Sequence, residues 1–183
     1  MGDWFQTIVD RDASLEEARE LAREIRDWLV DRGIVQETVT DCVLGGDGHG
    51  YPPGPNFEQV TDTSPHHDIR NIWTNGLQLI IGRTVFDPGQ GDHNIICPQC
   101  QTAYDDHGQW SKAISEWYEG KAGMLRCTHC KQPTPIIEWT FDPPWGFGNL
   151  GFVFWNWPPL KGEFISEVGG RLKHHVVVVK GKL

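Results

Sequence analysis

The sequence predicts a single α+β domain over residues 1–183, with two main helices on one face of a mixed β-sheet. Three observations lead to this prediction. A strand-like segment and an amphipathic helix open the chain, a helix and a strand close it, and two Cys-x-x-Cys pairs lie between them. The pairs define a unit inserted at residues 93–133. With 183 residues, 38% of them hydrophobic and 22% charged, the chain is long enough to bury its own core.

The first two elements have the clearest sequence signals. Residues Trp4–Asp10 are aromatic and β-branched, which favours a strand. A helix is expected at about 15–32, because apolar residues recur there at helical spacing. Ser14 and Glu17 form a capping-box pattern, in which each side chain accepts a hydrogen bond from the other residue's backbone N–H. Gly33 follows where a helix C-terminal cap belongs.

The region between the first helix and the cysteines combines extended segments with loops. Ile34–Leu44 predicts a second strand or an extended segment. Residues 45–55 are rich in glycine and proline and predict a loop, which lacks the lysine-containing pattern of a phosphate-binding loop. Strand residues are expected at Leu77–Ile81 and Thr84–Phe86, with Gly82 as a bend or bulge between them.

The second half of the chain predicts five further elements. A short strand at Ile95 and Ile96 leads into the first cysteine pair, a helix lies at about 110–121, and a strand follows at Ile136–Phe141. A helix at 160–172 and a strand at 174–179 close the chain, and four consecutive valines predict that this last strand is buried on both faces. The order of strands and helices at the two ends resembles the ferredoxin-like arrangement.

An unusual aromatic stretch, residues 142–159, combines three tryptophans and three phenylalanines with glycines and prolines. The favoured interpretation is that Phe152, Phe154 and Trp157 fill the core while the glycines form tight turns. In the alternative, part of the stretch is an exposed aromatic patch that binds a partner. The residues predicted for partner binding, including one from the loop at 45–55, are Tyr51, Trp145, Phe147, Trp155 and Trp157.

The two cysteine pairs are Cys97-Pro98-Gln99-Cys100 and Cys127-Thr128-His129-Cys130. A two-residue gap lets both sulfurs of a pair face one ion, and two such pairs supply the closed tetrahedral shell of structural zinc. We therefore expect one structural Zn²⁺ ion held by Cys97, Cys100, Cys127 and Cys130. The pairs resemble the knuckles of zinc-ribbon proteins, over about a fifth of the chain. The resemblance implies a metal-binding unit and no particular activity.

Charge and cysteine usage limit the classes of function. The formal net charge is −9 and no run of Lys or Arg occurs, so the sequence does not favour nucleic-acid binding. The negative charge favours a basic protein partner instead. No stretch approaches the ~20 apolar residues of a membrane span, and no signal peptide is recognised. Unpaired cysteines suit a reducing cytoplasm. The fifth cysteine, Cys42, is expected to be a small buried hydrophobic residue.

Three functional hypotheses follow. The favoured one is a non-enzymatic, zinc-stabilised cytoplasmic module that binds a protein, such as an immunity- or antitoxin-like neutraliser of a basic partner. The second is a metal-dependent hydrolase near the 45–55 loop and His66–Asp68, with Asp47 and His49 as further groups. The third is a nucleic-acid-binding zinc-ribbon protein. Four thiolates leave zinc no open position for water, which favours the first hypothesis over the second.

Overall fold

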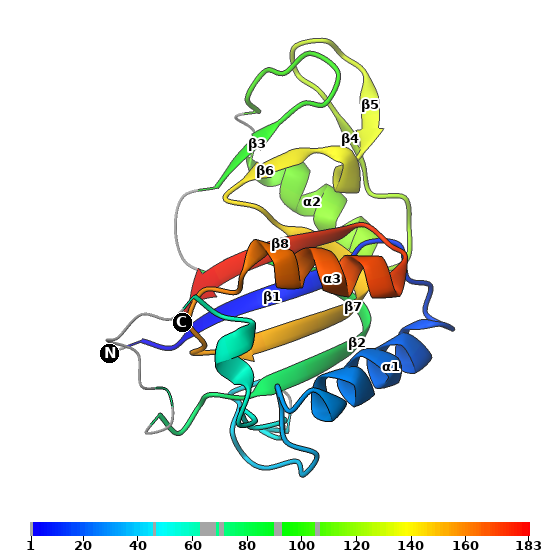
Figure 1. Cartoon of the computed structure of the whole chain (residues 1–183). Coiled ribbons are helices and arrows are strands. Elements are labelled where there is room, and N and C mark those ends of the chain that lie inside the picture. Colours follow the sequence, from blue (N-terminus) through cyan, green and yellow to red (C-terminus); the bar gives the residue numbers. More distant parts are fainter. Residues whose placement is uncertain (1, 46, 63–68, 70–71, 90–92, 105–106) are drawn as a thin grey trace.

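The computed structural model describes residues 2–183 except residues 46, 63–68, 70–71, 90–92 and 105–106. Four strands form one sheet in the order β2-β7-β1-β8, and two helices lie against one of its faces (Figure 1). The chain is an α+β protein, as the sequence predicts. The elements of this body are β1 (Trp4–Asp10), α1 (Ala18–Asp31), β2 (Leu77–Phe86), β7 (Gly146–Trp155), α3 (Gly162–Leu172) and β8 (Val176–Lys182).

All three strand pairings of this sheet are antiparallel, so the expectation of a mixed sheet is wrong. The strands β1 and β2 run in the same direction, but β7 lies between them and pairs with both. The strand order is that of the ferredoxin-like arrangement, which the order of elements predicts. A parallel contact occurs only at the end of β8, as an isolated bridge between Gly89 and Lys182 in the described part of the chain.

The N-terminal end of α1 has the reciprocal hydrogen bonds of a capping box. The backbone N–H of Glu17 donates to Ser14 Oγ at 3.2 Å, and the backbone N–H of Ser14 donates to Glu17 Oε2 at 3.1 Å. The helix begins at Ala18, after a turn, and Gly33 follows its end with a φ of +67°. Four side chains of the apolar face are buried: Ala18, Ala22, Ile25 and Leu29.

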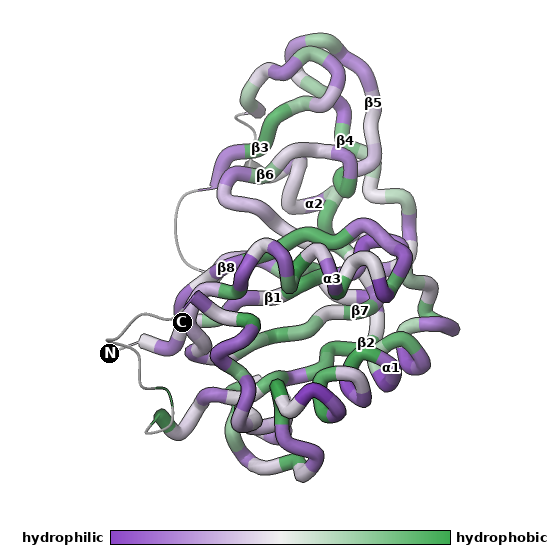
Figure 2. The backbone as a smooth tube through the Cα atoms, viewed as in Figure 1, coloured by the Kyte–Doolittle hydropathy of each residue, from purple (hydrophilic) through white to green (hydrophobic). Residues whose placement is uncertain are grey.

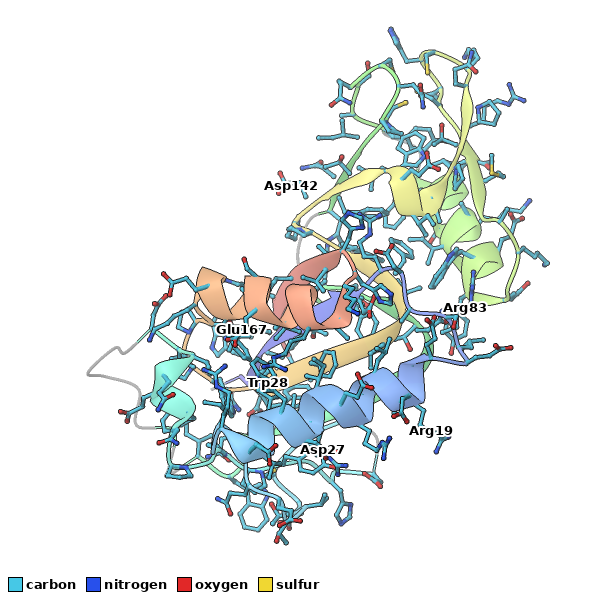
Figure 3. The ribbon with its side chains drawn as sticks, turned by 45° about the vertical axis from the view of Figure 1, so that its right-hand side comes forward. Arg19, Asp27, Trp28, Arg83, Asp142 and Glu167 are labelled. Atoms are coloured by element: carbon cyan, nitrogen blue, oxygen red, sulfur yellow. The ribbon has the colours of Figure 1, made fainter. Side chains whose placement is uncertain are left out.

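The main hydrophobic core lies between the sheet and the two helices. Phe152 and Phe154 of the central strand β7 are fully buried there, and Figure 2 shows apolar residues along β7 and β2. Trp28 of α1 reaches α3, next to the ion pair in which Arg32 Nη1 lies 2.7 Å from Glu167 Oε2 (Figure 3). The core interpretation of the aromatic stretch is therefore correct for these phenylalanines.

A bulge bends the hairpin formed by β2 and β7. The pairing register shifts between Ile81 and Thr84, and Gly82 lies there with a φ of +124°, as the sequence predicts. Beyond the bulge, the end of β2 and the start of β7 lie over the sheet face that the helices do not cover. The ring of Phe86 consequently lies over Gly151 and belongs to a small apolar cluster with Val9.

The glycines of the aromatic stretch are strand residues, so the prediction of tight turns is wrong. A Cβ at Gly148 would lie 2.2 Å from the backbone oxygen of Asp10, and one at Gly151 would lie 2.5 Å from the Phe86 ring. Gly146 similarly approaches the side chain of Val9. These positions need glycine because another segment crosses closely over β7, not because the backbone reverses there.

Three other expected strands differ from the structure. Residues 34–44 form only isolated bridges, such as the one between Thr40 and Gly50, and not a regular strand. Residues Ile136–Glu138 form a 3₁₀ turn, and the strand there is limited to β6 (Thr140–Asp142). The last strand, β8, is an edge strand, and Val176, Val177 and Val178 are half-buried rather than buried on both faces.

Residues 94–142, called here the cysteine lobe, come between β2 and β7 in the sequence and lie to one side of the sheet, at the top of Figure 1. Its elements are β3 (Asn94–Ile96), α2 (His107–Tyr118), β4 (Met124–Arg126), β5 (Pro133–Pro135) and β6. A second hydrophobic cluster fills the lobe and includes Trp110, Trp139 and, from β7, Phe147. Arg83 of β2 joins the lobe to the sheet, because its Nε donates to the backbone oxygen of Trp117 at 2.6 Å (Figure 3).

Candidate metal centre

Two short strands present the cysteine pairs, and the two pairs have the same backbone geometry. In the first, the N–H of Gln101 donates to the carbonyl of Cys97 at 2.9 Å, and in the second, the N–H of Lys131 donates to the carbonyl of Cys127 at 3.1 Å. Gln101 and Lys131 both have positive φ, at 58° and 62°. This repeated turn directs both sulfurs of each pair toward the same point.

The four sulfurs converge on one site. The Sγ atoms of Cys97, Cys100, Cys127 and Cys130 all lie within 4.8 Å of one another, and no other group of potential metal ligands is found among the described residues. Two of the edges are 3.8 Å (Cys97 to Cys130) and 3.7 Å (Cys100 to Cys127). A tetrahedron of thiolates with the ~2.3 Å bonds of zinc has edges of about 3.8 Å. The geometry is therefore that of a four-thiolate metal site.

The charges of these thiols also favour a cation. Hydrogen bonds from the side chain and backbone of Thr102 hold the pKa of Cys100 at about 6. A backbone hydrogen bond from Gln132 lowers the pKa of Cys130, but burial and the three neighbouring thiols outweigh it and raise that pKa to about 11. The Cys100 thiolate therefore forms readily, whereas deprotonation of Cys130 is unfavourable. A bound metal ion would lower the pKa of Cys130, because its charge stabilises all four thiolates.

The cluster is partly enclosed by the lobe, and Cys100 and Cys130 are half-buried. Cys97 and Cys127 are buried, and the backbone N–H of His129 donates to Cys127 Sγ at 3.4 Å. The His129 side chain is exposed and lies outside the ligand group, as the complete set of four thiols predicts. Tyr104 and Trp139 pack edge to face nearby in the lobe core, with ring centroids 5.3 Å apart. A metal held here is saturated by protein sulfur, so the site is suited to holding the lobe together.

The residues proposed for a hydrolase are not assembled into a site in the described part of the chain. Asp47 and His49 are exposed and contact each other, with His49 Nδ1 2.9 Å from the backbone oxygen of Asp47. His66 and Asp68 lie outside the described residues. The described part of the 45–55 loop thus supplies a local turn and no convergence of acid, base and metal ligands.

Most of the predicted partner-binding aromatics are in the core. Phe147, Trp155 and Trp157 are 6%, 6% and 5% exposed, because each packs into a hydrophobic cluster. Trp145 is half-buried against Trp110 and Phe141 in the cysteine lobe, and half-buried Tyr51 contacts Arg26 of α1. An exposed aromatic patch at 145–157 is therefore not what the structure shows. Partner binding by Tyr51 and Trp145 stays a prediction.

Two groupings were missed from the sequence because distant segments form them. The first is a cavity lined by Gln36, residues 40–42, 52–53 and 72–73, and Asn75. The second is a contact between the end of β1 and the start of β8, where His174 Nδ1 lies 2.8 Å from Oδ2 of fully buried Asp10. Paired histidines at 174 and 175 were visible in the sequence, but no pattern linked them to an aspartate more than 160 residues away.

The Asp10–His174 contact predicts a pH-dependent stability. The hydrogen bond to Asp10 raises the pKa of His174, so folding favours the protonated ring. This stabilisation is complete below about pH 6.5 and is lost as the pH rises through the raised pKa of the folded state. We expect His174→Ala to lower the free energy of unfolding by about 1–3 kcal/mol at pH 6 and by less at pH 9.

The matched control for this prediction is His175→Ala. His175 contacts Asp12 at 2.8 Å, but its side chain is 91% exposed, against 20% for His174. Its removal should change stability by less than about 0.5 kcal/mol. Urea unfolding of both variants at the two pH values measures the difference. Equal losses in the two variants, or a His174→Ala loss that grows with pH, would contradict the prediction.

No protein-family model, no curated protein and no solved structure matches this chain. None of the helices in the described ranges is long and apolar enough to cross a membrane.

Proposed function

We propose that this protein is a zinc-stabilised, non-enzymatic module that binds a basic protein partner. The convergence of four cysteine sulfurs at tetrahedral spacing carries the first part of the proposal. Zinc is the metal that suits this donor set best in a structural role, since it accepts four thiolates in a closed tetrahedral shell. A saturated ion offers no position for a substrate or water, which argues against metal-dependent hydrolysis at this site.

The distribution of charge supports a basic partner. Residues 1–71 contain 15 Asp and Glu against 6 Lys and Arg, whereas residues 72–183 contain 10 of each. The net charge of −9 therefore arises entirely in the part of the chain that contains β1, α1 and the loops after α1. Residues 94–133 contain four acidic and four basic residues, so the cysteine lobe lacks the positive surface that nucleic-acid binding requires.

An immunity- or antitoxin-like role is the form of this function that we propose. A compact acidic protein can occlude the basic active site of its target, and charge complementarity then speeds association and selects the partner. A reducing cytoplasm suits such a protein, because the four cysteine ligands must stay unpaired to hold metal.

Affinity capture at two salt concentrations tests the proposal. The protein, purified without added metal, should contain one zinc per chain. It should retain a basic protein at about 50 mM salt and release it at about 500 mM, because screening weakens contacts between exposed charges. A Glu24→Gln/Asp31→Asn variant of α1 should capture less than a matched Glu116→Gln/Glu119→Gln variant of the lobe. Equal capture by both variants, or retention that salt does not change, would contradict the proposal.

A further inference from the structure

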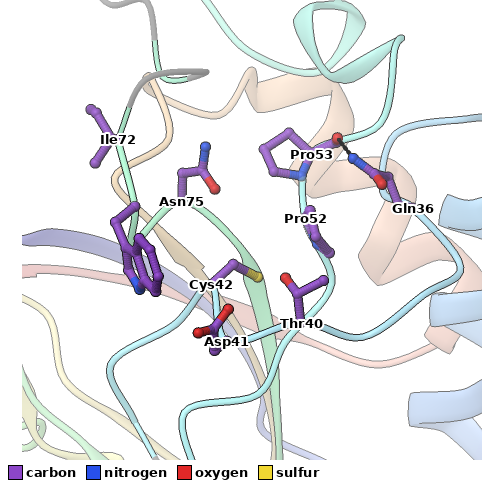
Figure 4. A pocket seen from close by; sticks show the side chains of 9 residues that line it. Gln36, Thr40, Asp41, Cys42, Pro52, Pro53, Ile72 and Asn75 are labelled. Atoms are coloured by element: carbon purple, nitrogen blue, oxygen red, sulfur yellow. Dashed lines mark hydrogen bonds between the residues drawn. The ribbon is translucent and has the colours of Figure 1, made fainter.

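A cavity of about 340 Å³ lies outside the cysteine lobe, beside the start of β2. Three segments contribute its lining residues, which are Gln36 with 40–42, 52–53, and 72–73 with Asn75, and none of these residues belongs to a helix or to the sheet. In Figure 4, Cys42 and Asp41 lie at the lower centre of the cavity, with Ile72 to the upper left and Thr40, Pro52 and Pro53 to the right. A cavity of this size is within the usual range for ligand sites.

Hydrogen bonds between the three segments hold the cavity open. The N–H of Gly76 donates to the carbonyl of Cys42 at 3.0 Å, and Gln36 Nε2 donates to the carbonyl of Pro53 at 3.0 Å (Figure 4). Buried Asn75 is fixed as well, since its side-chain Nδ2 donates to the backbone oxygen of Ile69 at 2.6 Å and its backbone oxygen accepts from Trp157 Nε1 at 2.6 Å. A site that is already formed loses little conformational entropy when it binds a ligand.

Asp41 gives this cavity a negative charge. Its side chain is exposed, and no described residue makes an ion pair with its carboxylate. The neighbouring thiol does not add a second charge, because burial and then the charge of Asp41 raise the pKa of Cys42. Cys42 therefore lines the cavity as a neutral thiol.

The remaining walls are aromatic and apolar. Trp73 lines the cavity and is 75% exposed, the highest exposure among the large hydrophobic residues of the described chain. A cation over the face of an indole ring is attracted by it, and a carboxylate nearby adds a charged partner. The two prolines, Pro52 and Pro53, offer an apolar surface on which the methylene groups of a long basic side chain can pack.

We propose that this cavity binds the cationic side chain of an arginine or lysine from the basic partner. The charged group lies between Asp41 and Trp73, and its methylene stem packs against the prolines. The inference rests on the proposed function and adds the point of contact to it. The excess of acidic residues in positions 1–71, which include two of the three lining segments, favours a cationic occupant over a neutral or anionic one.

Titration of the 183-residue chain with a short arginine peptide, acetyl-Gly-Arg-Gly-amide, tests the inference by NMR. The indole N–H of Trp73 and the amides of residues 40–42 should shift saturably. The citrulline peptide has nearly the same shape without the charge. Its affinity should be lower by about tenfold or more. Asp41→Asn should weaken arginine-peptide binding by about tenfold and Trp73→Ala by about fivefold. Both residues are exposed, so neither substitution threatens the fold.

Glu37→Gln is the matched control, because Glu37 is an exposed carboxylate close in sequence that does not line the cavity. It should change the dissociation constant by less than about twofold. The inference is overturned if Glu37→Gln weakens binding as much as Asp41→Asn, if citrulline binds as well as arginine, or if no saturable shift occurs.

The two proposals fail in different ways. If the basic partner captured from extracts binds Asp41→Asn and Trp73→Ala as tightly as the unaltered protein, the cavity inference is wrong. The proposed function, binding of a basic protein, is then still supported. If the arginine peptide binds in the cavity but no basic protein is captured, the cavity remains a cation site and the proposed function fails.

Discussion

Replacement of Cys127 with serine should remove the bound metal and unfold the cysteine lobe while the four-stranded sheet persists. Serine cannot replace a thiolate ligand, and structural zinc in small domains contributes an apparent ~10–16 kcal/mol to folding. The sheet keeps a separate core between its strands and the two helices. Hydrogen exchange should therefore become fast across residues 94–142 and stay slow in β1 and β7, with zinc falling from one ion per chain to none.

The matched control is Cys42→Ser, which removes a thiol of the body instead of a ligand. This variant should still bind one zinc per chain, and hydrogen exchange in its cysteine lobe should stay slow. Loss of protection across the whole chain in Cys127→Ser would show that metal also holds the body, through contacts such as Arg83 to Trp117 and Phe147 in the lobe cluster. Retention of a full zinc equivalent would rule out the four-thiolate site.

Leu150→Ala should produce the opposite pattern, with a large loss of global stability and no loss of metal. Leu150 is fully buried at the centre of the main core, on the strand that pairs with both β1 and β2. Removal of a buried leucine side chain costs about 2–5 kcal/mol, from lost burial and the cavity left behind. The lobe lies elsewhere along the chain, so the zinc content should stay at one ion per chain in the folded protein.

Leu44→Ala is the control for this substitution, because Leu44 is 46% exposed and belongs to no core cluster. Its effect on the free energy of unfolding should stay below about 0.5 kcal/mol. Urea denaturation of both variants, followed by far-UV circular dichroism, gives the comparison. Similar stabilities for the two variants would mean that β7 is not the centre of the core.

Local sequence signals were sufficient wherever a feature depends on neighbouring residues. The capping box at Ser14 and Glu17 and the bulge at Gly82 are short patterns whose geometry is decided within a few residues. The four metal ligands belong to the same class. Each Cys-x-x-Cys turn directs its own sulfurs, so the pairs could be recognised before the lobe that brings them together was known.

Features that depend on distant contacts could not be predicted in this way. The glycines at 148 and 151 resemble turn signals, and only the structure shows that Asp10 and Phe86 cross over them. The β-branched residues of 34–44 suggest a strand, but isolated bridges to the next loop use this backbone instead. The cavity beside β2 escaped detection for the same reason, because three separate segments supply its walls.

The position of β7 between β1 and β2 has a consequence for the order in which a growing chain can fold. When β1, α1 and β2 have been synthesised, β7 is still missing, although it lies between β1 and β2 and pairs with both of them. The cysteine lobe comes next along the chain, and most of its contacts lie within residues 94–142. The cysteine pairs and the short strands of the lobe can therefore become ordered before β7 has been synthesised, and Phe147 of β7 then completes the hydrophobic cluster of the lobe.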